Sequence, residues 1–75
     1  MSSQYKYQEQ FAHELYESWL NGNKEHVRLT IRGLKNKAQA AYIAAAVCAF
    51  LASDDANGGL SAACAFNAFI HPNNR

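Results

Sequence analysis

Apolar side chains recur every three or four positions through the first twenty residues, and this spacing predicts an amphipathic helix over 5–20. The residues of the apolar stripe are Phe11, Ala12, Leu15, Tyr16, Trp19 and Leu20. The opposite face, which we expect to be exposed to solvent, carries Glu9, His13 and Glu17. We expect the helix to end at residues 21–23, because Gly22 readily adopts the left-handed backbone conformation that closes many helices.

A second, shorter helix is predicted to run from its N-cap at Asn23 to residue 34 or 35. Glu25 lies in its first turn, where the helix dipole favours negative charge. The apolar edge of this helix consists of Val27, Ile31 and Leu34. Gly33 weakens the helix near its end, since glycine has a low helix propensity.

The third predicted helix, over 37–53 with Asn36 as its cap, is apolar almost all round. Its large side chains lie on one side and are Ile43, Val47, Phe50 and Leu51. Its small side chains lie on another and are Ala41, Ala45, Cys48, Ala49 and Ala52. A helix of this kind is normally buried on several sides, so we expect it at the centre of the fold.

A turn at 54–59, rich in Asp, Asn and Gly, leads to a fourth predicted helix over 60–70. The apolar side of that helix consists of Ala62, Phe66, Phe69 and Ile70. The four helices and their short connections predict an all-α fold, in which two helical hairpins pack into a four-helix assembly. The whole chain, 1–75, is expected to form a single domain.

The composition indicates a folded protein that gains from a partner chain. At 75 residues, a single hydrophobic core is near the size at which it becomes marginal. Hydrophobic residues make up 49% of the chain, which is typical of folded domains, but many of them are alanines that bury little area. We therefore expect a homodimer.

Net charge and hydropathy limit the cellular compartments and the kinds of partner that we expect for this protein. The formal net charge of +1 favours neither a polycation that binds nucleic acid non-specifically nor an acidic mimic of DNA. The N-terminus lacks the apolar segment of a signal peptide, and the apolar-rich stretch over 38–52 is shorter than the roughly 20 residues that span a bilayer. The sequence thus predicts a cytoplasmic protein with no membrane association.

Two cysteines, Cys48 and Cys64, lie at equal distances from Ala56 in the intervening turn. An antiparallel hairpin brings them to one level, so a disulfide is geometrically feasible. Cytosolic cysteines usually behave as small buried hydrophobes, which favours reduced thiols in the core. Zinc is disfavoured, because the chain lacks a Cys-x₂-Cys pair or a Cys/His cluster with ligand spacing.

Motifs for catalysis are few. His13 and Glu17 stand where a zinc-protease helix carries the two histidines of H-E-x-x-H, but no third ligand is evident and such pairs are usually solvated. The turn at 54–59 lacks the pattern of a calcium loop, and its two glycines lack the lysine of a phosphate loop. We therefore predict a non-enzymatic protein without metal or cofactor, and keep a metal-dependent enzyme built on His13 and Glu17 as an alternative.

The strongest candidate site is a basic stripe on the second predicted helix. Its residues are Lys24, Arg28, Arg32 and Lys35, which the spacing places on one helical face, and Lys37 just beyond them. One interpretation is a solvated face paired with the glutamates of the first helix. The other is a docking surface for an acidic partner, either an acidic protein surface or nucleic acid held through its phosphates.

The third predicted helix helps to separate these two partners. A helix-turn-helix protein would place a recognition helix with exposed polar side chains here, whereas this helix has an apolar sequence. An acidic protein surface is therefore the expected partner, and a small nucleic-acid-binding or transcription-modulating protein is the alternative. Tyr5 and Tyr7 are the aromatic residues expected to join the interface, since tyrosine is enriched at protein interfaces.

Residues 11–23, with the sequence Phe-Ala-His-Glu-Leu-Tyr-Glu-Ser-Trp-Leu-Asn-Gly-Asn, resemble the opening helix of small uncharacterised proteins from phage and plasmid accessory regions. The likeness covers under a fifth of the chain. It implies a class of short proteins that bind and modulate a host or defence protein, as anti-CRISPR-like inhibitors do. It assigns a function to no individual residue.

Overall fold

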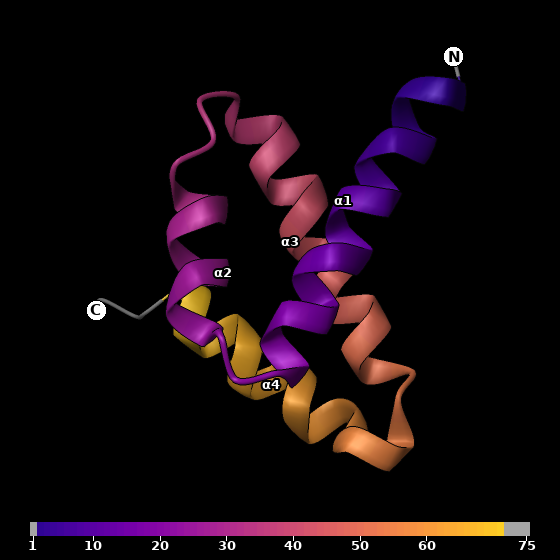
Figure 1. Ribbon diagram of the computed structural model, residues 1–75, viewed down its shortest axis with the longest axis vertical. Coiled ribbons are helices and arrows are strands. Elements are labelled where there is room, and N and C mark those ends of the chain that lie inside the picture. Colours follow the sequence, from indigo (N-terminus) through magenta and orange to yellow (C-terminus); the bar gives the residue numbers. More distant parts are fainter. Residues whose placement is uncertain (1, 72–75) are drawn as a thin grey trace.

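The computed structural model describes the backbone of residues 2–71 and the side chains of residues 8–71. The described residues form four α-helices and one short 3-10 helix (Figure 1). Their bounds are α1 Ser2–Leu20, α2 Lys24–Arg32, α3 Lys37–Ala52, η1 Asp55–Asn57 and α4 Gly59–Ile70. The predicted all-α fold is confirmed.

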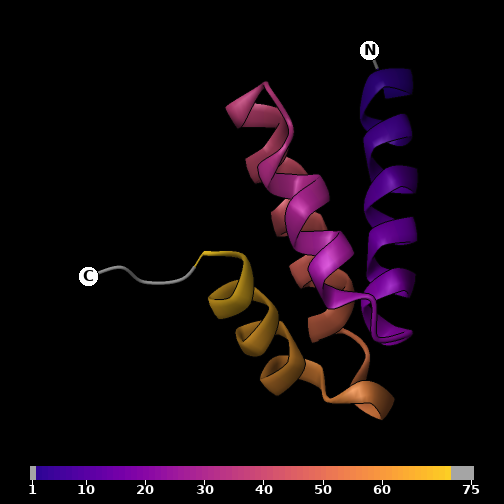
Figure 2. The same cartoon turned by 60° about the vertical axis from the view of Figure 1, so that its left-hand side comes forward.

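Helix α3 contacts each of the other three helices and occupies the centre of the fold. In Figure 1, α1 and α3 run down the view, α2 runs back up, and α4 crosses the bottom. The turned view of Figure 2 shows α2 lying over α3, with α1 on one side and α4 on the other. The residues of α3 that this position buries are Ile43, Ala44, Val47 and Leu51.

Every α-helix contributes one row of apolar side chains to a single core. The buried residues are Ala12, Leu15, Trp19, Val27, Ile31, Ile43, Ala44, Val47, Leu51, Ala63, Phe66 and Ile70. Trp19 joins α1 to α4, since its ring meets Phe66 edge-on with the centroids 5.1 Å apart and lies 5.7 Å from Phe69. Leu20, which the apolar spacing assigned to the stripe, is exposed instead.

Two of the predicted helix ends have the expected geometry. Gly22 has a positive φ of 90°, and the next amide, that of Asn23, donates to the Ser18 carbonyl at 2.9 Å and closes α1. At the start of α3, the side chain of Asn36 accepts a hydrogen bond from the Gln39 amide at 3.0 Å. Asn23 also precedes α2 as predicted, but its side chain makes no capping hydrogen bond there.

Helix α2 ends at Arg32, earlier than the predicted residue 34 or 35. Gly33 forms its C-cap, and Asn36 has the extended backbone that a capping residue needs, with ψ at 111°. The chain must therefore leave the helical conformation between these two residues. The cap of α3 thus shortens α2, an effect that local spacing along α2 alone does not reveal.

The alanine face of α3 is open in this chain. Ala41, Ala45 and Ala49 are exposed, whereas Ile43, Val47 and Leu51 on the other side are buried. The expectation that α3 would be buried on several sides is wrong for this face, because no other helix of the described chain covers it. The core nevertheless uses the large side chains that the sequence assigned to it.

The two cysteines are free and differ in their surroundings. Cys48 is half-buried, and its thiol points to the Ala63 carbonyl of α4 at 3.7 Å. Cys64 is exposed, so its expected place in the core is wrong. The two residues lie near each other on adjacent helices, where both line one groove together with Leu60.

A polar contact ties α1 to the turn after α3. The Tyr16 hydroxyl donates a hydrogen bond to the Asp54 carboxylate, which also accepts one from the Asn57 amide at 2.9 Å. The hydrogen bond from Tyr16, followed by that from Asn57, lowers the pKa of Asp54 below its ordinary value of 3.8. The same bond with Asp54 is the main reason that the pKa of Tyr16 rises above 10.0.

This contact predicts a pH dependence that Tyr16→Phe removes. A lowered carboxyl pKa stabilises the fold above the unfolded value of 3.8, and this contribution is lost as the pH falls through the folded pKa. A raised phenol pKa stabilises the fold below 10.0, and that contribution is lost as the pH rises through the folded pKa. We expect wild type to exceed Tyr16→Phe in its urea midpoint at neutral pH, with the gap closing at both extremes. A gap that stays constant from pH 2 to pH 11 would contradict this assignment.

Candidate functional site

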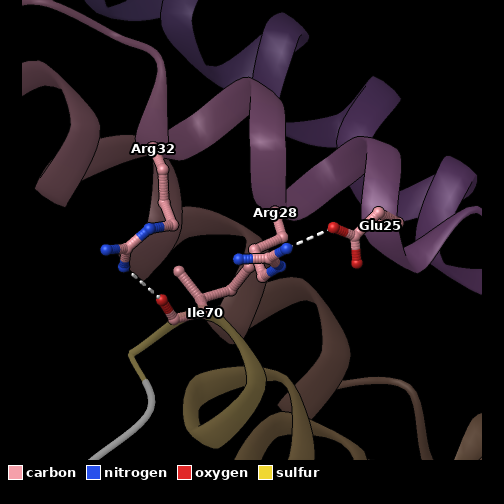
Figure 3. Close-up of polar contacts among 4 residues, drawn as sticks. All are labelled: Glu25, Arg28, Arg32 and Ile70. Carbon is pink, nitrogen blue, oxygen red and sulfur yellow. Dashed lines mark hydrogen bonds and ion pairs between the residues drawn. The ribbon is translucent and has the colours of Figure 1, made fainter. Parts of the chain in front are cut away.

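Arg28 of the predicted basic stripe packs against α4. Its guanidinium carbon lies 5.6 Å from the centroid of the Phe69 ring, and the group pairs with Glu25 on the preceding turn of α2 (Figure 3). A cation over an aromatic ring contributes about 0.5–1 kcal/mol at exposed sites. The carboxylate that pairs with Arg28 thus belongs to α2 itself and not to a glutamate of α1, which corrects the solvated-face interpretation.

Arg32 caps the end of α4. Its Nη1 donates a hydrogen bond to the Ile70 carbonyl at 3.0 Å (Figure 3). The last carbonyls of a helix have no partner within it, and the negative end of the helix dipole attracts a cation there. Arg28 and Arg32 therefore both hold α2 against α4. The sequence pattern does not indicate this structural role of the two guanidinium groups.

The lysines of the predicted stripe lie in three different places. The Lys24 ammonium is 5.0 Å from the centroid of the Trp19 ring, at the start of α2. Lys35 lies beyond the end of α2, so the prediction that it shares one helical face with the arginines is wrong. Lys37 begins α3. Lys35 and Lys37 are both exposed, and no ion pair joins either to another described side chain.

A groove of about 240 Å³ lies where the end of α2, the start of α3 and the end of α4 meet. We name it the basic groove, and its lining residues are Ile31, Arg32, Lys37, Ala40, Ala41 and His71. No aspartate or glutamate is among these lining residues. The basic groove can receive a negatively charged group, since two permanent cations and an imidazole line it together with Ile31, Ala40 and Ala41, which we name its aliphatic floor.

Sequence reasoning missed His71 and the aliphatic floor of the basic groove. His71 follows the last residue of α4, and the floor residues Ala40 and Ala41 lie on the first turns of α3. These residues approach Arg32 only because α3 and α4 run antiparallel beneath α2. The available signal was the distance from the turn, because Ala41 and His71 each lie 15 residues from Ala56 and an antiparallel hairpin brings such residues to about the same level.

The remaining candidate residues form no comparable site. His13 Nδ1 lies 3.7 Å from Glu17 Oε2, and both side chains are well exposed. No group of three or more His, Cys, Asp or Glu side chains suited to a metal ion occurs among the described residues. Tyr5 and Tyr7, predicted to join the interface, have side chains outside the described part of the structure.

Comparison of the chain with protein-family models, with curated proteins and with solved structures gives no match. Within the described residues, each helix is too short or too polar to cross a membrane. The candidate site therefore rests on the geometry of the basic groove and on the charges around it.

Proposed function

We propose that this chain is a non-enzymatic interaction protein that binds an acidic surface of another protein. The observation that carries the proposal is the convergence of Arg32, Lys37 and His71 on one groove without an acidic neighbour. Lys35 extends the same positive region on the connection between α2 and α3. We name these four residues the basic end. Charge complementarity of this kind steers association and selects partners with a negative surface.

The basic side chains of the basic end differ in whether they are free to bind a partner. Arg32 is anchored to α4 by its hydrogen bond to Ile70, whereas Lys35 and Lys37 are exposed and make no ion pair with a described side chain. A lysine on the rim of an interface affects binding without holding the fold together. We therefore assign the first contact with the partner to Lys35 and Lys37.

We propose further that the partner is a host or defence protein in the cytoplasm and that binding modulates or inhibits it. The support for this part is the resemblance of residues 11–23 to short proteins of phage and plasmid accessory regions. Small accessory proteins of that class act by occupying a surface of a larger protein. A 75-residue chain that brings Arg32, Lys35, Lys37 and His71 together at its basic end suits such a role.

Affinity capture from the native host tests this function. We expect one protein to co-purify with wild type and with Gln10→Glu, and to be lost with Lys35→Gln or Lys37→Gln. The Gln10 variant is a matched control, because it lowers the net charge by one, as each lysine variant does, at an exposed position outside the basic groove. Equal capture by all four proteins would reject the basic end as the binding surface.

Nucleic acid bound through its phosphates is the alternative. It is favoured by the exposure of Lys24, Lys35 and Lys37, whose charges are available to phosphates. Counterion release makes such binding fall steeply with salt. A duplex DNA probe that binds at 50 mM salt and dissociates at 200 mM, together with capture that nuclease abolishes, would replace the acidic protein with nucleic acid.

We also propose that the protein acts as a homodimer. Support comes from the open face of α3, where exposed Ala45 and Ala49 lie between two grooves of about 430 and 410 Å³. Leu60 borders one of these grooves and is 73% exposed, an uncommon loss of apolar burial in so small a chain. Contiguous exposed apolar surface of this kind often marks an interface between chains.

The dimer predicts that Ala45→Glu separates the chains without unfolding them. A carboxylate at an exposed position of α3 leaves the core intact, but it would be buried without a partner between two copies. Ala68→Glu, at an exposed position on α4, is the control. We expect sedimentation at 100 µM protein to give a dimer for wild type and Ala68→Glu and a monomer for Ala45→Glu, with equal helicity by circular dichroism. A monomeric wild type would rule out the dimer.

A further inference from the structure

The basic groove is small and is lined by both charged and apolar residues, and these two properties determine which ligand it can bind. The basic residues that line it are Arg32, Lys37 and His71, and the apolar residues that line it are Ile31, Ala40 and Ala41. The volume of about 240 Å³ accommodates a single amino-acid side chain and is too small for a folded segment. A ligand that satisfies both kinds of lining residue needs a negative end and an apolar stem.

The guanidinium of Arg32 is held in place before any ligand arrives. Its Nη1 is engaged by the Ile70 carbonyl at 3.0 Å, while the other terminal nitrogen points away from Ile70 (Figure 3). An arginine carries five N–H donors in a fixed planar fork, so several remain for an acceptor. A guanidinium whose rotamers are already restricted loses less entropy when it binds a carboxylate.

The N-terminus of α3 adds positive charge to the same place. Lys37 is the first residue of α3, and no acidic residue lies in the first turn to offset the positive end of its dipole. The dipole alone would not define a site. Together with three side chains from three separate elements, it makes the basic groove the most consistently positive concave region of the described surface that we find.

From this arrangement we propose that the basic groove binds one carboxylate on an aliphatic stem, the side chain of a glutamate on the partner protein. The carboxylate lies between Arg32 and Lys37, His71 donates a further hydrogen bond, and the methylene groups of the glutamate lie on Ala40 and Ala41. A phosphate group would meet the cations but would leave the aliphatic floor without an apolar contact. This inference rests on the proposed function, since it names the group by which an acidic partner is recognised.

A blocked glutamate tripeptide, acetyl-Gly-Glu-Gly-amide, is the direct probe, with its glutamine counterpart and inorganic phosphate as comparisons. We expect the glutamate peptide to shift the amide NMR signals of residues 31, 32, 37, 40 and 41 with a millimolar Kd. The glutamine peptide and phosphate should bind at least fivefold more weakly. Tighter binding of phosphate than of the glutamate peptide, equal binding of the two peptides, or shifts confined to other residues would each overturn the proposal.

Two variants sharpen the test. Ala41→Asp puts a carboxylate into the basic groove itself, so it should abolish binding of the glutamate peptide. Ala65→Asp, at an exposed position on α4 outside the basic groove and outside the proposed dimer face, should leave binding within twofold of wild type. Equal effects of the two variants would overturn the assignment. If the peptide fails to bind while capture of the partner still depends on Lys35 and Lys37, the carboxylate site is wrong and the proposed function stands.

Discussion

Replacement of Phe66 by alanine is expected to unfold the protein. Phe66 is 1% exposed and is the largest fully buried side chain in the described core. It joins α4 to α1 through its edge-on contact with Trp19. Phenylalanine-to-alanine changes in cores cost about 3–5 kcal/mol. A single core of this size rarely supplies more than that amount in total.

Phe69→Ala is the matched control for that change. Phe69 lies one turn after Phe66 and also contacts Trp19, but it is only partly buried. Its truncation should lower the thermal midpoint measured by circular dichroism and leave a cooperative transition. Phe66→Ala should lack such a transition at 25 °C. If the two variants melted at the same temperature, the core would not depend on Phe66 in the way that its burial indicates.

The second large effect is expected when a buried alanine of the core is replaced by a larger side chain. Ala44 is 6% exposed and lies among the buried residues of α3, so Ala44→Leu must displace its neighbours. Extra methylene groups in a packed core cost about 1–3 kcal/mol. A loss of that size is a substantial part of the stability of a small domain.

Ala38→Leu separates this steric effect from helix propensity. Ala38 is exposed on the first turn of the same helix, and leucine is nearly as good a helix former as alanine, so the contribution of propensity is small for both substitutions. Urea unfolding followed at low micromolar concentration should show a lower midpoint for Ala44→Leu and a nearly unchanged one for Ala38→Leu. Equal midpoints would mean that the region around Ala44 is loosely packed.

The sequence predicted most of this fold because its helices carry strong local signals. Gly22 and Asn36 mark a helix end and a helix start by their intrinsic backbone and capping preferences, and both have these roles in the structure. Of the large apolar residues that the spacing assigned to one side of α3, Ile43, Val47 and Leu51 are buried, whereas Phe50 is only partly buried. The end of α2 was misplaced, because the cap of the next helix determines it.

The site could be predicted only in part, because it depends on tertiary contacts. Spacing along α2 identified Arg28 and Arg32 as cations on one face, but it could not show that this face meets Phe69 and the last carbonyl of α4. Lys37 was included by its nearness in sequence, and it does line the basic groove. His71 enters the groove from the other end of the chain, beyond the reach of any local pattern.

The central claim is that Lys37 binds the partner without holding the fold together, and one titration tests it most directly. The partner obtained by capture is titrated calorimetrically against wild type, Lys37→Gln and Gln10→Glu, with the urea midpoint of each protein measured beside it. We predict that Lys37→Gln binds about tenfold more weakly, a loss of roughly 1.4 kcal/mol, at an unchanged midpoint. Gln10→Glu should match wild type in both measurements. Equal affinity of Lys37→Gln and Gln10→Glu for the partner would contradict the account.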